Sequence, residues 1–435
     1  MNLSASPIST SAPAPRPALK PLDEAVAELL AHAGSGLPGA LETVSTFGAD
    51  GRVLAEDVRA ALDVPGHDNS AMDGYAVRVA DWVSISAAAT ADTGFAVSQR
   101  VAAGAAPIQA LAAGTVARIF TGAPIPPGAD AVIVQEESSR ADDGTVRFSA
   151  RPAPGQNIRR AGEDIARGHT VLARGRRLSP ADLGLLASIG VHQVAVYRRP
   201  RVALLSTGDE LVMPGEVAPE ALPPGAIFNS NRFFLRSLLQ RLGCEVSDLG
   251  IVPDRLDATI ETLARAAATH DLIVSSGGVS VGEEDHVKPA VQALGTLALW
   301  QVAIKPGKPF AYGTIPRADG GLAHFAGLPG NPVSSYVTCL LLLRPFVLRL
   351  QGVAETAPLA LAAVADFEWT RPDPKRREFL RVRVGADGRL ARFAHQGSGV
   401  LTSVAWASGL IDNPPGGVIA PGDAVRYLAF PELLA

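Results

Sequence analysis

Within residues 201–278, five runs indicate the fold class. They are RVALLST (201–207), NRFFLRSLLQRLG (231–243), EVSDLGIV (245–252), LDATIETLARAAATH (256–270) and DLIVSSGG (271–278). The first, third and fifth runs are short and rich in Val, Ile and Leu, which favours strands. The other two repeat their apolar residues with the 3.6-residue period of a helix. Strands that alternate with helices predict a parallel sheet with helices on both faces. Ligands bind such sheets beyond the carboxyl ends of the strands.

The chain before this stretch changes character twice. The first twenty residues are rich in Ser, Ala and Pro and contain no sustained apolar run, which predicts a disordered tail and no signal peptide. Helical patterns follow at 22–33 and at 179–189, where Ser179 is suited to cap the helix and Pro180 to begin it. Between them, short runs such as YAVRVADW, TVARIF, ADAVIVQEE and GTVRFSA predict a small β domain.

The chain after this stretch contains one long apolar segment. Residues 333–350 include Arg344, Pro345 and Arg349, which a membrane span would tolerate poorly, so they predict a buried helix and no membrane association. Beyond about residue 355, the runs FEWT, REFLRVRV and AVRYLAF predict strands of a last small β domain.

Length and composition limit the class of protein. At roughly 100–200 residues per domain, 435 residues predict two to four domains. A net charge of −4 argues against general binding of nucleic acid or of an acidic membrane. The two cysteines, Cys244 and Cys339, provide neither a disulfide framework nor a cysteine zinc site, which fits the reducing cytoplasm. We therefore expect a cytoplasmic multidomain protein.

Carboxylates follow the predicted strands at the edge where ligands bind. Asp209 and Glu210 follow the first strand, Asp254 follows the second, and Asp285 comes after the third. Several carboxylates at one edge repel one another unless a cation lies between them, and Mg²⁺ takes oxygen ligands beside a phosphate. The alternative is that Asp209 and Asp285 merely cap the helices that follow them.

Two further features suggest that anions bind at the same edge. Gly277 and Gly278 form a turn whose backbone N–H groups an anion can approach, although the turn has neither a Walker A nor a GxGxxG pattern. The chain has 34 Arg and only 5 Lys, yet Lys288, Lys305 and Lys308 fall within 21 residues. An ammonium group can hold a small tetrahedral anion as a point charge, so we favour an anion site over chance clustering on a solvated face.

Other polar loops carry a weaker signal. In GLPGNPVSS (327–335), Asn331 is suited to cap a helix that begins at Pro332, and the helix start, with Ser334 and Ser335, could bind an anion. The same segment would begin a helix well without any ligand. Three loops of the predicted β region, at 68–76, 121–124 and 159–164, are polar, but their spacing does not place them in one site.

Seven segments in series resemble one family, the MoeA-type molybdopterin molybdenumtransferases, which include the gephyrin E domain. They are DNSAMDGYAV, FTGAPIPPGADAVI, NIRRAGEDI, STGDEL, SSGGVSVGEEDHVK, IKPGKPF and GLPGNPVSS, in order from residue 68 to residue 335. The resemblance covers nearly the whole chain after residue 20. A CinA-like nucleotide hydrolase would share the αβ domain, but such proteins lack the 60–160 insertion and the MDGYAV and RAGEDI segments.

The resemblance implies an elongated homodimer of α/β and β domains. The αβ domain would resemble the MoaB and MogA adenylyltransferases, and the C-terminal β domain would be barrel-like. The implied parts are a tail (1–20), a segmented linker domain (21–60 and 156–195), an inserted β domain (61–155), the molybdopterin-binding αβ domain (196–352) and the C-terminal β domain (353–435). By family analogy, the cleft lies between the αβ domain of one subunit and the inserted β domain of its partner.

The resemblance also implies the reaction. Such enzymes take adenylylated molybdopterin, for which a MogA-like adenylyltransferase is the expected donor, and molybdate. They cleave the phosphoanhydride with Mg²⁺, release AMP and leave molybdenum on the dithiolene sulfurs. A non-catalytic scaffold that binds pterin and other proteins is the alternative, which the presence of Lys305, Glu210 and Asp285 argues against.

Site residues carry over by motif. Glu210, Asp254 and Asp285 would hold Mg²⁺ and the pyrophosphate. Lys305 would contact molybdate or phosphate, with Lys308, Ser334, Pro329 and Pro332 around it and Gly277 and Gly278 facing the pterin or its phosphate. The partner subunit would add Asp73, Thr121, Arg159 and Asp164. This chain departs from the family at Gln301 and Ala161, where a lysine and a third arginine are common.

Overall fold

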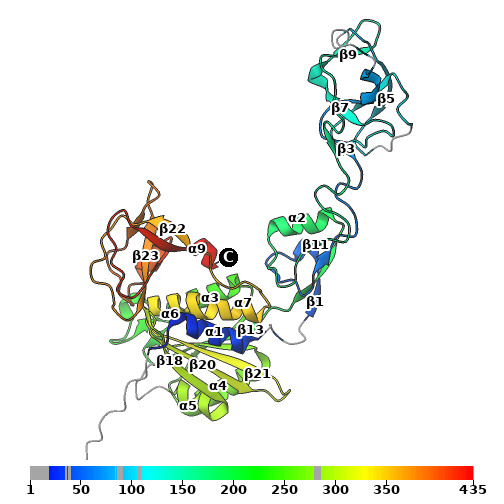
Figure 1. The fold of residues 1–435 in the computed structure, drawn as a ribbon. Helices are drawn as coiled ribbons and strands as arrows, with labels where there is room; N and C mark the ends of the chain where they lie inside the picture. The colour runs from blue at the N-terminus through cyan, green and yellow to red at the C-terminus, as the bar shows by residue number, and fades with distance from the viewer. Residues whose placement is uncertain are drawn as a thin grey trace, which may run out of the picture. The chain divides into compact units, whose positions relative to one another are not determined.

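The computed structural model describes residues 19–34, 37, 41–83, 85, 92–104, 109–278 and 286–434. Contacts divide the chain into two compact units, which Figure 1 shows as a ribbon. Unit 1 comprises Val196–Ala435 with Met1–Glu42 and Gly51–Val53, and unit 2 comprises Thr43–Asp50 and Leu54–Ala195. Each unit is described below by itself, and the domain boundaries given above stay predictions.

Unit 1 is built on a six-stranded sheet that contains the three strands expected from residues 201–278. Its order is β16 (Glu245–Val252), β13 (Arg201–Thr207), β17 (Leu272–Ser276), β21 (Leu322–Leu328), β20 (Pro309–Pro316) and β18 (Thr296–Gln301). The first four strands are parallel, but β20 pairs antiparallel with both β21 and β18. The sheet is therefore mixed. β20 and β21 are joined by residues 317–321 alone, and a connection as short as this can join only antiparallel strands.

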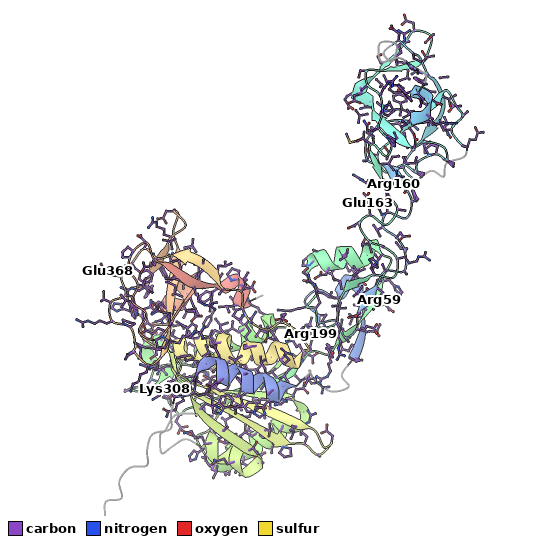
Figure 2. All side chains as sticks on the ribbon, in the orientation of Figure 1. Arg59, Arg160, Glu163, Arg199, Lys308 and Glu368 are labelled. Atoms are coloured by element: carbon purple, nitrogen blue, oxygen red, sulfur yellow. The ribbon has the colours of Figure 1, made fainter. Side chains whose placement is uncertain are left out.

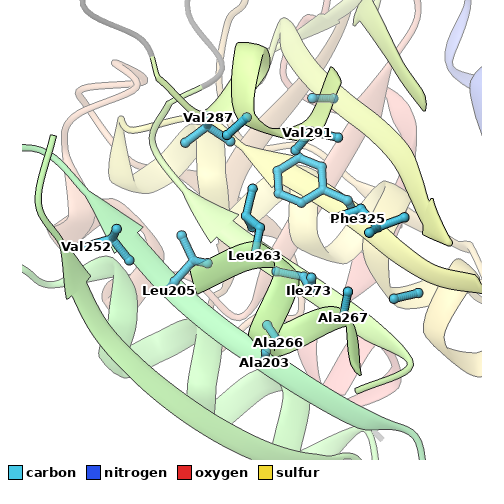
Figure 3. Close-up of a cluster of buried hydrophobic side chains, with 14 residues drawn as sticks. Ala203, Leu205, Val252, Leu263, Ala266, Ala267, Ile273, Val287, Val291 and Phe325 are labelled. Carbon is cyan, nitrogen blue, oxygen red and sulfur yellow. The ribbon is translucent and has the colours of Figure 1, made fainter. Parts of the chain in front are cut away.

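Helices cover both faces of this sheet, as the alternating pattern predicts (Figure 1). One face carries α4 (Leu256–Thr269) and α5 (Val287–Leu294), and the other carries α3 (Asn231–Arg241) and α1 (Leu22–Ala33). Figure 3 shows the core under α4 and α5, where Leu263, Val291 and Phe325 are all fully buried. Burial of this apolar surface holds the strands in place, and with them the loops at their carboxyl ends.

The long apolar segment after residue 331 forms a core helix. It contains α6 (Pro332–Thr338), one wider π-helical turn (Cys339–Leu343) and α7 (Arg344–Leu350). In the part of the chain that the structure describes, Pro332–Leu350 is the one helix long and apolar enough to cross a membrane. It is 94% buried inside the protein, which is how the core helix of a soluble domain behaves.

The last part of unit 1 is a second sheet, ordered β19 (Ile304–Lys305), β23 (Arg377–Val384), β25 (Gly409–Asn413), β26 (Ala424–Ala429) and β22 (Leu361–Val364). The short β24 (Leu390–Arg392) pairs with β23, and a bridge from Ala365 to Leu390 curls the sheet back toward β22. FEWT is not a strand, since Trp369 makes only an isolated bridge to Ile419. The strand lies earlier, at β22.

Unit 2 contains the predicted helix and the predicted small β domain. Helix α2 (Pro180–Ser188) begins with a capping box in which the Ser179 and Asp182 side chains bond each other's backbone N–H groups. The β domain is a four-stranded sheet ordered β5 (Ala96–Val101), β6 (Thr115–Ile119), β4 (Gly74–Val77) and β7 (Ala131–Val134). The expected strand YAVRVADW ends at Val77, and a 3₁₀ turn carries Trp82 into the core against Phe95.

Candidate active site

A pocket of about 560 Å³ lies in unit 1 beyond the carboxyl ends of β13, β17 and β21. Its wall comes from the segments that follow these strands and from the starts of α3 and α6. The lining residues discussed below are Thr207, Glu210, Asn229, Asn231, Asp254, Ser276, Gly277, Gly278, Pro309, Pro329, Gly330, Pro332 and Ser334. The pocket thus occupies the sheet edge where the alternating pattern predicts a ligand.

The glycine turn after β17 fits where a side chain would not. Gly277 and Gly278 have φ of 92° and 70°, in the left-handed region that glycine adopts without strain. A Cβ on Gly278 would lie 2.3 Å from Cγ2 of Val287, and one on Gly277 would lie 3.0 Å from the Thr207 carbonyl oxygen. The Gly277 N–H donates to the Leu328 carbonyl, so this particular N–H is occupied, which the sequence did not reveal.

Two of the three predicted metal ligands lie on the pocket wall. Glu210 and Asp254 line the pocket, and the Asp254 N–H donates to the Asp209 carboxylate at 3.4 Å. No helix begins after Asp209, because the chain continues into β14 (Leu211–Val212), so the capping alternative is wrong for Asp209. Asp285 lies outside the described residues. Within those residues, no group of three or more His, Cys, Asp or Glu side chains is arranged to hold a metal ion.

Helix α6 begins at the pocket as predicted, with Asn331 in the capping position and Pro332 in the first turn. The Asn331 side chain makes no capping hydrogen bond, and the Val333 N–H donates instead to the Ser398 carbonyl at 2.9 Å. Ser334 and Ser335 are buried, and the Ser335 hydroxyl has no partner among the described residues. The helix start therefore brings Ser334 to the pocket wall, while the unsatisfied Ser335 hydroxyl is buried outside the lining.

Sequence reasoning missed Asn229 and Asn231, which lie at the start of α3. Both line the pocket and are 2% and 8% exposed. The Asn231 amide donates to Ser276 Oγ at 2.9 Å and to the Gly330 carbonyl at 2.8 Å, which ties α3 to the ends of β17 and β21. Two amides within three residues before a helix, in FNSN, were the available signal, but the pattern was interpreted only as the start of a helix.

Lys305 and Lys308 do not line this pocket, although Pro309 of the same loop does. Figure 2 labels Lys308. The Lys305 ammonium group, 40% exposed, forms an ion pair with the Glu378 carboxylate at 2.9 Å. Glu378 is 1% exposed and also accepts a hydrogen bond from the Trp369 indole. The structure thus brings Lys305 to a buried carboxylate that the sequence analysis did not identify.

Arg381 on β23 is a second residue that sequence reasoning missed. It is 1% exposed, and its guanidinium donates to Ser403 Oγ and to the Phe379 and Gly397 carbonyls. No carboxylate pairs with it in the described part of the chain, and burial lowers its pKa to about 10. A buried guanidinium without a counter-ion is a candidate for binding an anion. The strand pattern REFLRVRV, which contains Arg381, does not indicate that this arginine is buried.

The four predicted residues of unit 2 come from three loops that the structure brings together. Ser70 exchanges backbone hydrogen bonds with the 122–123 turn, and Ile158 pairs with Ser70, so the loops after residues 68, 121 and 157 meet. Asp73 accepts hydrogen bonds from the N–H and hydroxyl of Thr121 at 2.7 and 2.8 Å. These bonds hold the pKa of Asp73 below its ordinary value.

Arg159 and Asp164 lie on the third of these loops. Arg159 is exposed and pairs with Asn69 across a two-residue ladder, and the Asp164 N–H donates to the Val64 carbonyl. Beside them, the Arg160 N–H donates to the Glu163 carboxylate, and both residues are labelled in Figure 2. The Ala161 N–H donates to Asp68, a bond that does not need the arginine side chain common at this position.

Three family models match this chain in order. They are the MoeA N-terminal region (domain I and II) over residues 20–190, the probable molybdopterin-binding domain over 203–349 and the MoeA C-terminal region (domain IV) over 363–430. Together they span most of the chain. They also include the N-terminal segments that a CinA-like protein would lack.

Similar proteins give the same assignment. A molybdopterin molybdenumtransferase of Haemophilus influenzae is 43% identical over 332 residues, which cover 76% of this chain and 78% of that protein. One of a Nostoc species is 36% identical over 90% of this chain and 89% of its own. The crystal structure of a molybdopterin biosynthesis MoeA protein from Pyrococcus horikoshii superposes with a TM-score of 0.80 at 28% identity, covering 95% of this chain and all of that one. From the matched models and the similarity along its length, this chain belongs to the MoeA family.

Proposed function

We propose that this chain is a molybdopterin molybdenumtransferase of molybdenum cofactor synthesis. It would take adenylylated molybdopterin and molybdate, cleave the phosphoanhydride with Mg²⁺, release AMP and leave molybdenum on the dithiolene sulfurs. One observation carries the proposal. The pocket at the carboxyl edge of the sheet gathers Glu210, Asp254 and the glycine turn, and these are the groups that a metal-bound phosphoanhydride needs.

The pocket residues fit Mg²⁺. Glu210 and Asp254 offer carboxylate oxygens, which are hard ligands, and Mg²⁺ is usually held by one or two carboxylates together with substrate phosphates. Asp285 is proposed as a third acid from its motif alone. When bound, Mg²⁺ would neutralise charge that develops on the phosphoanhydride oxygens. Glu210 and Asp254 would orient that link.

The remaining groups would orient the substrates. The Ser334 hydroxyl, on the pocket wall at the start of α6, would hold a phosphate, and the positive end of the helix dipole would favour the anion. For molybdate we propose Lys305 together with Lys308. Arg381 lies three residues after Glu378, the partner of Lys305, and so faces the other side of β23. The Val333 N–H at the α6 start donates to the Ser398 carbonyl in the segment that follows β24. Arg381 donates to the Gly397 carbonyl of the same segment.

We also propose that the enzyme is a homodimer and that Asp73, Thr121, Arg159 and Asp164 act in the cleft of the partner subunit. A MogA-like adenylyltransferase would supply the adenylylated substrate. A mixing experiment tests the shared cleft. Asp73→Asn and Glu210→Gln subunits, each inactive alone, should regain about a quarter of the wild-type rate when mixed, because each mixed dimer contains one intact cleft. No recovery would place both residues in clefts formed within one subunit.

The activity itself is tested by AMP release from adenylylated molybdopterin as Mg²⁺ and molybdate are varied. Wild-type protein should need both ions. Glu210→Gln and Asp254→Asn should lower the rate at limiting Mg²⁺ by about 10²-fold or more, as is typical for loss of a group that stabilises transition-state charge. Glu261→Gln on α4, whose exposed carboxylate pairs with Arg265 one helical turn away, is the matched control.

The second candidate function is a scaffold that binds the pterin without turnover. The ion pair between Lys305 and Glu378 favours it, because a paired lysine is less available to an oxyanion. A scaffold would leave adenylylated molybdopterin intact under all concentrations of Mg²⁺ and molybdate. A nucleotide hydrolase, in contrast, would release AMP without any need for molybdate.

A further inference from the structure

Two arginines and two aromatic rings form a row on one face of the four-stranded sheet of unit 2. Tyr75 on β4 is opposite Arg118 on β6, and Arg118 is opposite Arg100 on β5. Phe120 follows two residues after Arg118 and so faces the same side. We call these four residues the arginine–aromatic row. It lies beside Thr121 and Asp73, which the proposed function places in the cleft.

The guanidinium groups of the two arginines stack on the two aromatic rings of the row. The Arg118 guanidinium lies 5.2 Å from the Tyr75 ring centroid and 4.7 Å from that of Phe120, and the Arg100 guanidinium lies 4.5 Å from the Phe120 centroid. Arg118 also donates to the Gly74 carbonyl at 3.0 Å and to the Gln135 side chain at 2.7 Å. Arg118 is therefore held in one orientation, while Arg100 is exposed.

The charges of the row are not balanced within the protein. Like charges directly opposite each other on neighbouring strands destabilise a sheet, and Arg100 and Arg118 are such a pair. In the described ranges, neither guanidinium has a carboxylate within 4 Å. Hydrogen bonds from Thr121 lower the pKa of the Asp73 carboxyl, and the charge of Arg118 acts in the same direction, but this carboxylate is already bonded to Thr121. An anionic ligand would relieve this repulsion.

We propose that the arginine–aromatic row binds a planar heteroaromatic ring that carries a phosphate, the ring stacking on the exposed Arg100 guanidinium plane, which Phe120 supports, and the phosphate accepting hydrogen bonds from the edge of that guanidinium. Guanidinium planes and aromatic rings both stack on heteroaromatic bases, and guanidinium groups pair with phosphate through two parallel hydrogen bonds. The inference rests on the proposed function, because adenylylated molybdopterin contains two such ring systems, the adenine and the pterin. The row would recognise one of them.

The test measures binding of two probes to the full chain by calorimetry: AMP, and the phosphate ester of 6-hydroxymethylpterin. Arg100→Gln removes the charge, and Phe120→Leu removes the ring but keeps apolar bulk. Each should raise the Kd of one probe about tenfold, since one variant removes the guanidinium that holds the phosphate and the ring, and the other removes the aromatic ring that supports this guanidinium. Arg147→Gln, an exposed arginine on β9 (Val146–Phe148) of the same unit, is the control and should change neither Kd.

The outcomes separate the two proposals. A weaker affinity for AMP assigns the row to the adenine, and a weaker affinity for the pterin ester assigns it to the pterin. Unchanged affinities in both variants, or no binding of either probe by wild-type protein, would overturn the role of the row even if AMP release is normal. Conversely, probe binding through the row with no AMP release in the presence of Mg²⁺ and molybdate would leave the row standing and reject the proposed activity.

Discussion

At the scale of single residues, the ion pair of Lys305 with Glu378 bears on the proposed binding of molybdate. The carboxylate is almost fully buried and holds both the lysine and the Trp369 indole. An ammonium group bound in this way is fixed in position at the end of β19. The pair can therefore keep Lys305 ready for an oxyanion, or it can serve only to neutralise the buried carboxylate.

Lys305→Met should separate these roles. We expect a loss of about 1–3 kcal/mol in the free energy of unfolding, below the 3–5 kcal/mol typical of a fully buried pair, because the lysine is partly exposed. The double variant Lys305→Met/Glu378→Gln should recover most of that stability. If the lysine binds molybdate, the molybdate concentration needed for half-maximal AMP release should rise in both variants. Full recovery of the molybdate response in the double variant would contradict a binding role.

Asp271, just before β17, gives a prediction for pH. Burial alone would raise the pKa of its carboxyl, but hydrogen bonds from Arg198 and from the Arg201 N–H, and the charges of Arg198 and Arg317, outweigh burial and hold it below 3.8. A depressed carboxyl pKa stabilises the fold above the unfolded value, and that contribution is lost as pH falls through the folded value. Asp271→Asn should therefore lower stability at pH 7 by about 2–4 kcal/mol, since a buried partner is removed.

Urea unfolding at pH 7 and at pH 3 checks this prediction. The difference between wild type and Asp271→Asn should be large at pH 7 and smaller at pH 3, because pH 3 lies below the unfolded pKa and part of the wild-type advantage is lost there. Asp319→Asn, an exposed carboxyl that also lies near Arg317, is the control. A difference of the same size at both pH values would mean that Asp271 acts through packing alone.

At the scale of elements, the glycine turn after β17 connects the sheet to the pocket. Gly278 and Gly320 have similar positive φ values of 70° and 81°, but only Gly278 would press a Cβ against a neighbour. Both alanine variants should lose about 1–2 kcal/mol from the left-handed backbone. Gly278→Ala should lose about 1–3 kcal/mol more, because the Val287 side chain at the start of α5 must move.

The activity of these two variants extends the test. Gly278→Ala should lower the rate of AMP release, since α5 or the turn must shift next to the pocket, whereas Gly320→Ala should leave the rate unchanged. Both predictions are checked by measuring thermal unfolding and AMP release on the same preparations of the two variants. Equal losses of stability in the two variants would show that the Val287 side chain moves aside with no loss in the free energy of unfolding.

At the scale of the whole molecule, the chain has two compact units with separate cores. Leu263 belongs to the core of unit 1 and Phe148 to that of unit 2. Chains with more than one domain commonly unfold in more than one step. Leu263→Ala, which should cost about 2–5 kcal/mol, and Phe148→Ala, at about 3–5 kcal/mol, should therefore lower different calorimetric transitions. A single transition lowered by both variants would show that the units unfold together.

The sequence by itself determined most of the helices and strands and part of the pocket wall. Strand and helix periods, the cap at Ser179 and the glycine turn depend on neighbouring residues, so local patterns were sufficient to predict them. The sequence also placed Glu210, Asp254 and Gly278 at the pocket, because the carboxyl ends of parallel strands lie at one edge of the sheet. Asp285 could not be tested, since it lies outside the described residues.

Only the tertiary structure decided which distant groups meet. The Lys305–Glu378 pair joins residues 73 positions apart, and the repulsion between Arg100 and Arg118 depends on which strands are neighbours and in which register. Two further features also depend on the tertiary structure. They are the burial of Arg381 without a counter-ion and the antiparallel pairing of β20 at the end of the sheet. The physical reason is that burial and charge pairing are properties of the packed chain, and a local pattern of residues does not specify its partners across the fold.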